Sequence, residues 1–185
     1  APLTVVIGCL ARSVRDVARW YDVCAGYDSR DPYSLPSPGG WESGLGSHAE
    51  ALRARLVAVV PDLGAATIRP ELDEAVRLAA AELVEATGMV LVDDVEVDVP
   101  GLGYEWAMAN LASLAAELGD RWPDCRDQLT KEIAFGMEMA KGVYDLDMAG
   151  RVETRRTQAN EAMAAVFDRA DVVICATNPD AAYPA

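Results

Sequence analysis

Few side chains in this sequence are placed to do chemistry by themselves. His48 is the single histidine, so we expect a surface residue of a loop or short helix rather than part of a metal site or a Ser-His-Asp triad. No two cysteines have C-x-x-C spacing, and no G-K-[ST] follows Gly39 and Gly40 as in a phosphate-binding loop. We therefore expect no metal site and no cofactor.

The composition and net charge of the chain disfavour some classes of binding partner. The net charge is −14, and phosphate attraction needs clustered cations, so a general nucleic-acid or anionic-membrane binder is not expected. No apolar run reaches the length of a membrane span. Cys24 and Cys175 lie among apolar neighbours, where a free thiol behaves as a small hydrophobic group. This cysteine usage predicts a reducing compartment, the cytoplasm.

The elements that must position any site follow an α/β pattern. Leu56–Val60 is a continuous apolar run, typical of a strand buried on both faces. A helix is predicted over Glu71–Thr87, since Pro70 suits its first position and Gly88 its C-cap. Residues 89–99 should form the next strand, and strand, helix and strand form a βαβ unit. The predicted apolar face of the helix is Leu72, Ala75, Val76, Ala79, Leu83 and Ala86.

Further helices are predicted over 103–119, 129–141 and 146–169, and a buried strand over Val172–Ala176. The last helix has an apolar stripe of Met148, Val152, Ala159, Met163, Val166 and Phe167. Together these elements predict an α/β fold, a fragment of an α/β/α sandwich in which a mixed sheet has helices on both faces.

Near the start of the chain, the segment Gly8–Pro36 contains several helix-capping signals close together. Ser13 precedes apolar residues at helical spacing, and Asp16 lies three residues later. This spacing predicts a capping box, in which the hydroxyl accepts from an early backbone N–H and the carboxylate accepts from the N-cap N–H. Gly26 suits the C-cap of this helix, where glycine adopts the left-handed conformation most easily. The predicted apolar face is Val14, Val17, Ala18, Tyr21, Cys24 and Ala25.

The order G-x-L-x-R-S-V-x-D, a short helix, A-G, then D-x-x-D-P resembles the amidase signature family. The resemblance rests on Gly8, Leu10, Arg12, Ser13, Val14, Asp16, Ala25, Gly26, Asp28, Asp31, Pro32 and Leu35. It continues through the βαβ unit and to Phe167, Asp171 and Thr177. Family members commonly have proline where this chain has Cys9 and Ala176.

The resemblance implies amide hydrolysis by a serine nucleophile, with a second serine that bridges the nucleophile to a lysine base. It also implies a glycine- and serine-rich loop whose backbone N–H groups donate to the oxyanion. In the family these parts lie upstream of the segment around Gly8. Here no serines are adjacent, and Lys131 and Lys141 are the only lysines. We therefore expect residues 1–185 to be a single C-terminal portion of an amidase-like domain whose N-terminal catalytic part is missing. This portion should be inactive alone and should contain no catalytic residue.

Polar side chains follow the last predicted strand. In open α/β sheets, ligands bind beyond the carboxyl ends of strands, and Thr177 and Asn178 stand at such an end. We expect them to line or support the substrate cleft of the intact enzyme; a surface turn at Asn178-Pro179 is the alternative. Gly8, Arg12, Ser13 and Asp16 are expected to be structural.

Two alternatives to an amidase remain open on the sequence. One is a non-catalytic acidic α/β module that binds a partner protein, and the other is part of the A-type subunit of a tRNA-dependent amidotransferase. If the chain is part of an amidase, we expect the intact enzyme to bind a small-molecule amide and to bind neither nucleic acid nor membrane. The sequence leaves open whether the protein forms a homo-oligomer.

Overall fold

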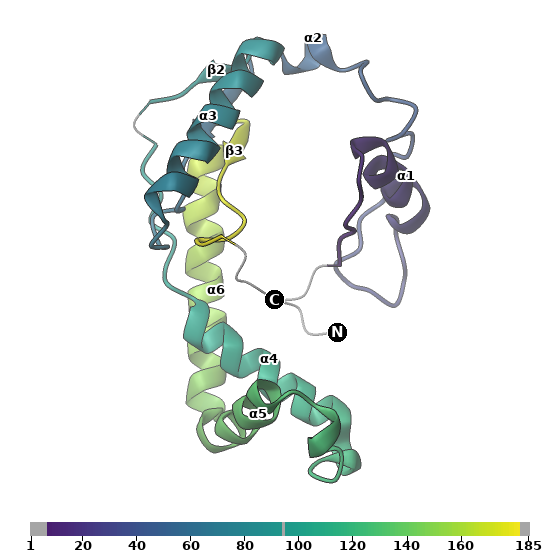
Figure 1. The fold of residues 1–185 in the computed structure, drawn as a ribbon, viewed down its shortest axis with the longest axis vertical. Helices are drawn as coiled ribbons and strands as arrows, with labels where there is room; N and C mark the ends of the chain where they lie inside the picture. Colours follow the sequence, from purple (N-terminus) through teal and green to yellow (C-terminus); the bar gives the residue numbers. More distant parts are fainter. Residues whose placement is uncertain (1–6, 94, 182–185) are drawn as a thin grey trace. The chain divides into compact units, whose positions relative to one another are not determined.

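A small parallel sheet organises the larger part of the computed structural model, which describes residues 7–93 and 95–181. The strands are β1 (Leu56–Val59), β2 (Val90–Leu91) and β3 (Val172–Ile174), in the order β2-β1-β3 (Figure 1). Val57 is paired with both Leu91 and Val172. The predicted strands beginning at Leu56 and Val172 are confirmed, and the segment 89–99 is a strand only at Val90 and Leu91. The sheet was expected to be mixed, but these strands are all parallel.

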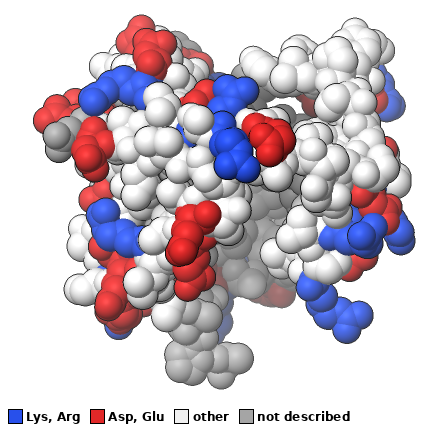
Figure 2. Space-filling model, turned by 90° about the horizontal axis from the view of Figure 1, so that it is seen from above, with Lys and Arg blue, Asp and Glu red and all other residues white. Residues whose placement is uncertain are grey.

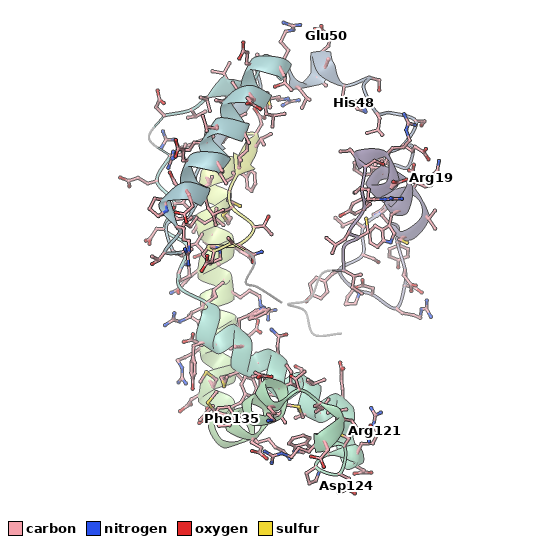
Figure 3. The ribbon with its side chains drawn as sticks, viewed as in Figure 1. Arg19, His48, Glu50, Arg121, Asp124 and Phe135 are labelled. Carbon is pink, nitrogen blue, oxygen red and sulfur yellow. The ribbon has the colours of Figure 1, made fainter. Side chains whose placement is uncertain are left out.

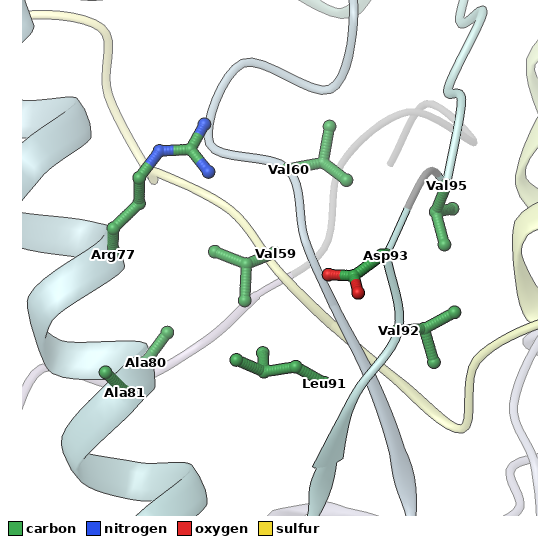
Figure 4. Close-up of a pocket in the computed structure, with 9 residues that line it drawn as sticks. All are labelled: Val59, Val60, Arg77, Ala80, Ala81, Leu91, Val92, Asp93 and Val95. Atoms are coloured by element: carbon green, nitrogen blue, oxygen red, sulfur yellow. The ribbon is translucent and has the colours of Figure 1, made fainter.

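The central strand β1 is covered on both faces. Val57 and Ala58 are each 0% exposed, and successive side chains of a strand point to opposite faces. The helix α3 (Pro70–Thr87) contacts β1, and the long helix α6 (Leu146–Phe167) runs along the other side of the strands (Figures 1 and 4). The predicted α/β architecture, with helices on both faces, is confirmed.

Helix α3 begins and ends as its sequence predicts, but it buries a different face. Pro70 occupies the first turn, and Gly88 caps the C-terminus in the left-handed conformation with φ 71°. Ala80 is its buried residue, whereas Leu83 is exposed. The predicted face is therefore partly wrong, because an alanine-rich helix offers two overlapping apolar stripes. The residues turned inward are Leu72, Val76, Ala80 and Val84.

The second half of the segment 89–99 is not a strand. Only Val90 and Leu91 join the sheet, and residues 95–100 lack regular structure. The backbone of Val97 instead lies against Gly64, where an added Cβ would be 1.9 Å from the Val97 carbonyl oxygen. Since Gly64 also has φ +69°, this turn accepts only glycine without rearrangement.

A group of helices lies between β2 and β3 in the sequence. It comprises α4 (Gly103–Leu118), the short 3₁₀ helices η1 (Gly119–Arg121) and η2 (Arg126–Gln128), α5 (Lys131–Val143) and α6. Helix α4 packs against α5 and α6. The side chains of Thr130 and Asp145 cap α5 and α6 by accepting from the backbone N–H groups of Ile133 and Met148. Most of the predicted α6 stripe is turned inward, but Phe167 is exposed.

Residues 7–53 form a separate unit, which we describe by itself. It contains α1 (Val14–Cys24) and the short α2 (Ala49–Leu52); Figure 3 labels Arg19 on α1 and His48 and Glu50 at α2. Ala18 is the buried residue of α1, and Val14 and Cys24 of the predicted apolar face are exposed.

The surface carries both signs of charge. On the face that Figure 2 shows, basic and acidic side chains are interspersed and form no continuous basic field. Among residues 7–93 and 95–181, no helix has the length and apolar character needed to cross a membrane.

Candidate functional site

Two loops meet at the carboxyl ends of β1 and β3. Residues 61–69 follow β1, and residues 175–181 follow β3. The backbone N–H of Ala176 donates to the carbonyl of Pro61 (3.0 Å), and that of Arg69 donates to the carbonyl of Pro179 (3.1 Å). The Arg69 guanidinium also pairs with the Asp180 carboxylate. These contacts fix the position of the segment that carries Thr177 and Asn178.

The two loops enclose a small hollow of about 110 Å³. Thr177 and Asn178 both line it, together with Asp62. A hydroxyl, an amide and a carboxylate offer donors and acceptors to a polar group, but they include no activated nucleophile. The remaining lining is Pro61, Leu63, Ala66, Ile68, Ala176 and Pro179.

Asp62 shapes the wall of this hollow. Its Oδ1 accepts from the Gly64 N–H at 2.9 Å, and its carbonyl accepts from the N–H groups of Ala65 and Ala66. Asp62 therefore holds the turn through its side chain as well as its backbone. The sequence places Asp62 only at the end of a strand, whereas the structure puts it beside Asn178, which lies more than a hundred residues later.

A larger hollow of about 330 Å³ lies between α3 and the ends of β1 and β2 (Figure 4). Valine, leucine and alanine side chains form most of its lining, with Arg77 and Asp93 as its charged residues. Arg77 is bound by Asp73 (Nε to Oδ2, 2.8 Å), and this hydrogen bond raises the pKa of the guanidinium. This hollow was not predicted from the sequence, although Asp93 follows an apolar run in the same way as Thr177 does.

No catalytic assembly is found in the part of the chain that the structure describes. Lys131 and Lys141 both lie on α5, and neither is hydrogen-bonded to a serine within residues 7–93 and 95–181. Over the same residues, no three His, Cys, Asp or Glu side chains are grouped so that they could hold a metal ion.

The motif near the start of the chain forms a helix cap in a modified form. The Ser13 Oγ accepts from the Asp16 N–H (3.2 Å) and donates to the Asp16 carboxylate (2.8 Å). The predicted acceptance by the hydroxyl is confirmed, but the carboxylate binds the hydroxyl rather than the Ser13 backbone. Arg12 is exposed, and an added Cβ at Gly8 would meet nothing within 4 Å.

Other contacts in residues 7–53 could not be read from the motif. The Asp22 carboxylate accepts from the backbone N–H groups of Trp41 (2.8 Å) and Glu42 (2.9 Å). Arg19 forms two hydrogen bonds with the Glu42 carboxylate, at 2.7 and 2.8 Å, and chiefly these lower the Glu42 pKa. A glycine-rich loop is thus held to α1 by polar groups about twenty residues away.

Comparison with known proteins extends these observations. The family model described as Amidase matches residues 1–185. The A subunit of glutamyl-tRNA(Gln) amidotransferase from Thermosynechococcus vestitus is 30% identical, over 97% of this chain and 41% of that protein. Its counterpart from Deinococcus radiodurans is 31% identical, over 96% and 40%. An amidase from Pseudomonas putida is 29% identical, over 93% and 36%.

A solved structure has the same fold. A bacterial aryl acylamidase of the amidase signature enzymes superposes with a TM-score of 0.68 at 21% identity, covering 92% of this chain and 37% of that one. The chain therefore spans about two fifths of the length of the curated relatives, 41% and 40% for the two amidotransferase proteins. Because the family model matches the chain from its first residue to its last, the chain belongs to the Amidase family, the family of the amidase signature enzymes.

Proposed function

We propose that the protein of which this chain is a portion hydrolyses the C–N bond of small linear amides, with a serine nucleophile outside residues 1–185. The match of the Amidase family over the whole chain carries this proposal. The chain supplies sheet, helices and loop walls, while its two lysines lie on α5 without a serine partner among the described residues. On this proposal, residues 1–185 are the C-terminal portion of the amidase domain.

The direct test assays the purified 185-residue chain beside a longer protein that includes it, on aromatic and aliphatic amides. We expect hydrolysis by the longer protein alone, because losing the nucleophile of a serine hydrolase costs about a million-fold in rate. Equal activity of both after repeated purification would place the catalytic centre inside residues 1–185 and refute this part of the proposal.

Thr177 and Asn178 are proposed to line the substrate cleft of the longer protein. Their position beside Asp62 in the hollow beyond β1 and β3 supports this role. Asn178→Ala in the longer protein should lower kcat/KM about tenfold through the loss of a polar contact. Asn160→Ala, on the exposed side of α6, is the matched control and should retain full activity. Unchanged kinetics for Asn178→Ala would remove the residue from the site.

A second candidate is the A-type component of a tRNA-dependent amidotransferase. The identities of 30% and 31% to the glutamyl-tRNA(Gln) amidotransferase proteins favour it. The longer protein, with its partner subunits, would then support glutamine-dependent amidation of glutamyl-tRNA(Gln), with little activity on simple amides. Measuring both reactions on one preparation separates the two candidates.

We also propose a cytoplasmic location and a small-molecule amide as the partner, without nucleic-acid or membrane contacts by this portion. The four free cysteines support a reducing compartment, and the net charge of −14 disfavours binding of phosphate backbones by this portion.

A further inference from the structure

Helix α5 has two apolar faces, and its own fold uses only one. Ala134, Met137 and Ala140 are buried on the inner face. On the outer side, Phe135, Met139 and Val143 follow one another at intervals of four residues and are 64%, 38% and 37% exposed. Residues four apart share one face of a helix, so these three form a continuous apolar stripe. Phe135 is labelled in Figure 3.

A groove lies at the N-terminal end of this stripe. It has a volume of about 510 Å³ and is lined by Arg126, Asp127, Leu129, Lys131, Ala134 and Phe135. Its charges are unequally engaged: Arg126 pairs with Glu138, whereas neither Lys131 nor Asp127 has an ion-pair partner among the described residues. The groove therefore combines apolar side chains with one lysine and one carboxylate that form no ion pair there.

The other end of α5 presents the complementary chemistry. Leu146, three residues after the last residue of α5, is 90% exposed. It stands between Asp145 and Asp147. Asp145 uses one carboxylate oxygen to accept from the Met148 N–H (2.8 Å), which leaves its second oxygen for another donor. An apolar side chain flanked by two carboxylates matches a groove with apolar walls and an available lysine.

We propose that a second copy of this chain docks on this face as a two-fold dimer, with Leu146 of each copy in the groove of the other. The groove and Leu146 lie at opposite ends of α5, whose 13 residues span about 20 Å. Antiparallel α5 helices bring both pairs together at once, with the two stripes between them. Lys131 of each copy then faces Asp147 of the other.

A second copy fits better than an unrelated partner because the surface is complementary to itself. Groove and insert occur on the same chain, which is the condition for an isologous contact. The antiparallel arrangement also closes after two copies, whereas a head-to-tail contact would continue into a filament. Dimer formation through α5 does not depend on the proposed amide hydrolysis.

The test measures the monomer–dimer equilibrium of the 185-residue chain by sedimentation over a range of concentrations. Leu146→Asp should raise the dimer dissociation constant by more than about tenfold, because it removes a buried apolar anchor. Lys131→Glu should raise it about tenfold, and Lys131→Glu combined with Asp147→Lys should restore most of the affinity. Lys141→Glu makes the same charge change on α5 outside the groove and should leave the constant unchanged.

Circular dichroism and Tm verify that each variant is folded, and since the altered side chains are exposed, the fold should tolerate them. A chain that stays monomeric at every concentration overturns the proposal. A dimer also overturns the proposal if Leu146→Asp and Lys131→Glu raise its dissociation constant no more than Lys141→Glu does. The same holds if combining Lys131→Glu with Asp147→Lys does not restore the affinity. A monomeric longer protein that Leu146→Asp destabilises would show that its additional residues cover this face, and would also overturn the proposal.

Discussion

Ser13 shows what one hydroxyl contributes to this chain. Its Oγ accepts the Asp16 N–H and donates to the Asp16 carboxylate, so it satisfies one of the free N–H groups at the start of α1. Ser13→Ala should lower the free energy of unfolding by about 1 kcal/mol, the usual loss for an N-cap. Urea unfolding measures the change.

Ser13→Thr is the matched control, because threonine retains the hydroxyl and is also a good N-cap. The free energy of unfolding of Ser13→Thr should be close to that of the wild type. An alanine variant as stable as the threonine variant would mean that the cap contributes nothing to stability.

Single residues differ in how far the sequence reveals their role. The Ser13–Asp16 pair could be predicted because a cap depends on neighbours three residues apart. Asp22 could not, since its two N–H donors are Trp41 and Glu42, and no local pattern specifies a partner about twenty residues away. The strand-end rule singled out Thr177 and Asn178, whose role in a substrate cleft stays a prediction. Their neighbour Asp62 in the hollow depends on which loops meet.

At the scale of elements, α4 and α5 approach closely where α5 has a glycine. A Cβ on Gly136 would lie 2.9 Å from Cδ1 and 3.1 Å from Cδ2 of Leu111. Gly136→Val should therefore destabilise the chain by about 1–3 kcal/mol through overpacking. Thermal unfolding followed by circular dichroism measures the effect.

Two variants separate overpacking from a change in helix propensity. Gly150→Ala, on α6, adds a Cβ that meets nothing within 4 Å, so it should be neutral or stabilising by up to about 1 kcal/mol. Leu111→Ala combined with Gly136→Val should recover part of the loss. If the double variant is only the sum of the two single losses, the two side chains do not compete for space.

Element identity was more predictable than element faces. Strong apolar runs and caps located β1, β3, α3 and α6 close to their observed bounds. The apolar face of α3 was partly wrong because its alanines lie on several sides, and hydropathy alone cannot choose among them. Residues 95–99 alternate like a strand, yet strand formation requires a neighbouring strand as well as a pattern.

At the scale of the whole molecule, Asp171 joins the two strands that are farthest apart in sequence. Its carboxylate accepts from the Leu56 N–H (2.8 Å) and from Arg55 (3.0 Å), so it connects β3 to β1. The Leu56 hydrogen bond, followed by the contact with Arg55, holds the Asp171 pKa below its usual value of about 3.8.

A lowered pKa in the folded chain fixes the direction of the pH effect. The contribution of Asp171 to stability is complete above the unfolded pKa near 3.8 and is lost as the pH falls through the lower folded pKa. Asp171→Asn should therefore show a smaller loss of stability than the wild type as the pH falls through this range. Urea unfolding at a series of pH values measures the two slopes.

Asp168→Asn, three residues earlier and also exposed, is the control and should keep the wild-type slope. The same slope in Asp171→Asn and the wild type would show that the link between β3 and β1 does not depend on the charge of Asp171.

The strand order β2-β1-β3 also has a consequence in time. A ribosome releases β1 long before β3, since Arg55 and its partner Asp171 are 116 residues apart. At about 5–20 residues per second, the wait is roughly 6–23 s. For that period one edge of the nascent central strand has no native partner, and the helices α4 to α6 emerge before it is closed. Chaperone binding during synthesis should therefore concentrate on Leu56–Val59 and end when residues 172–174 have left the exit tunnel.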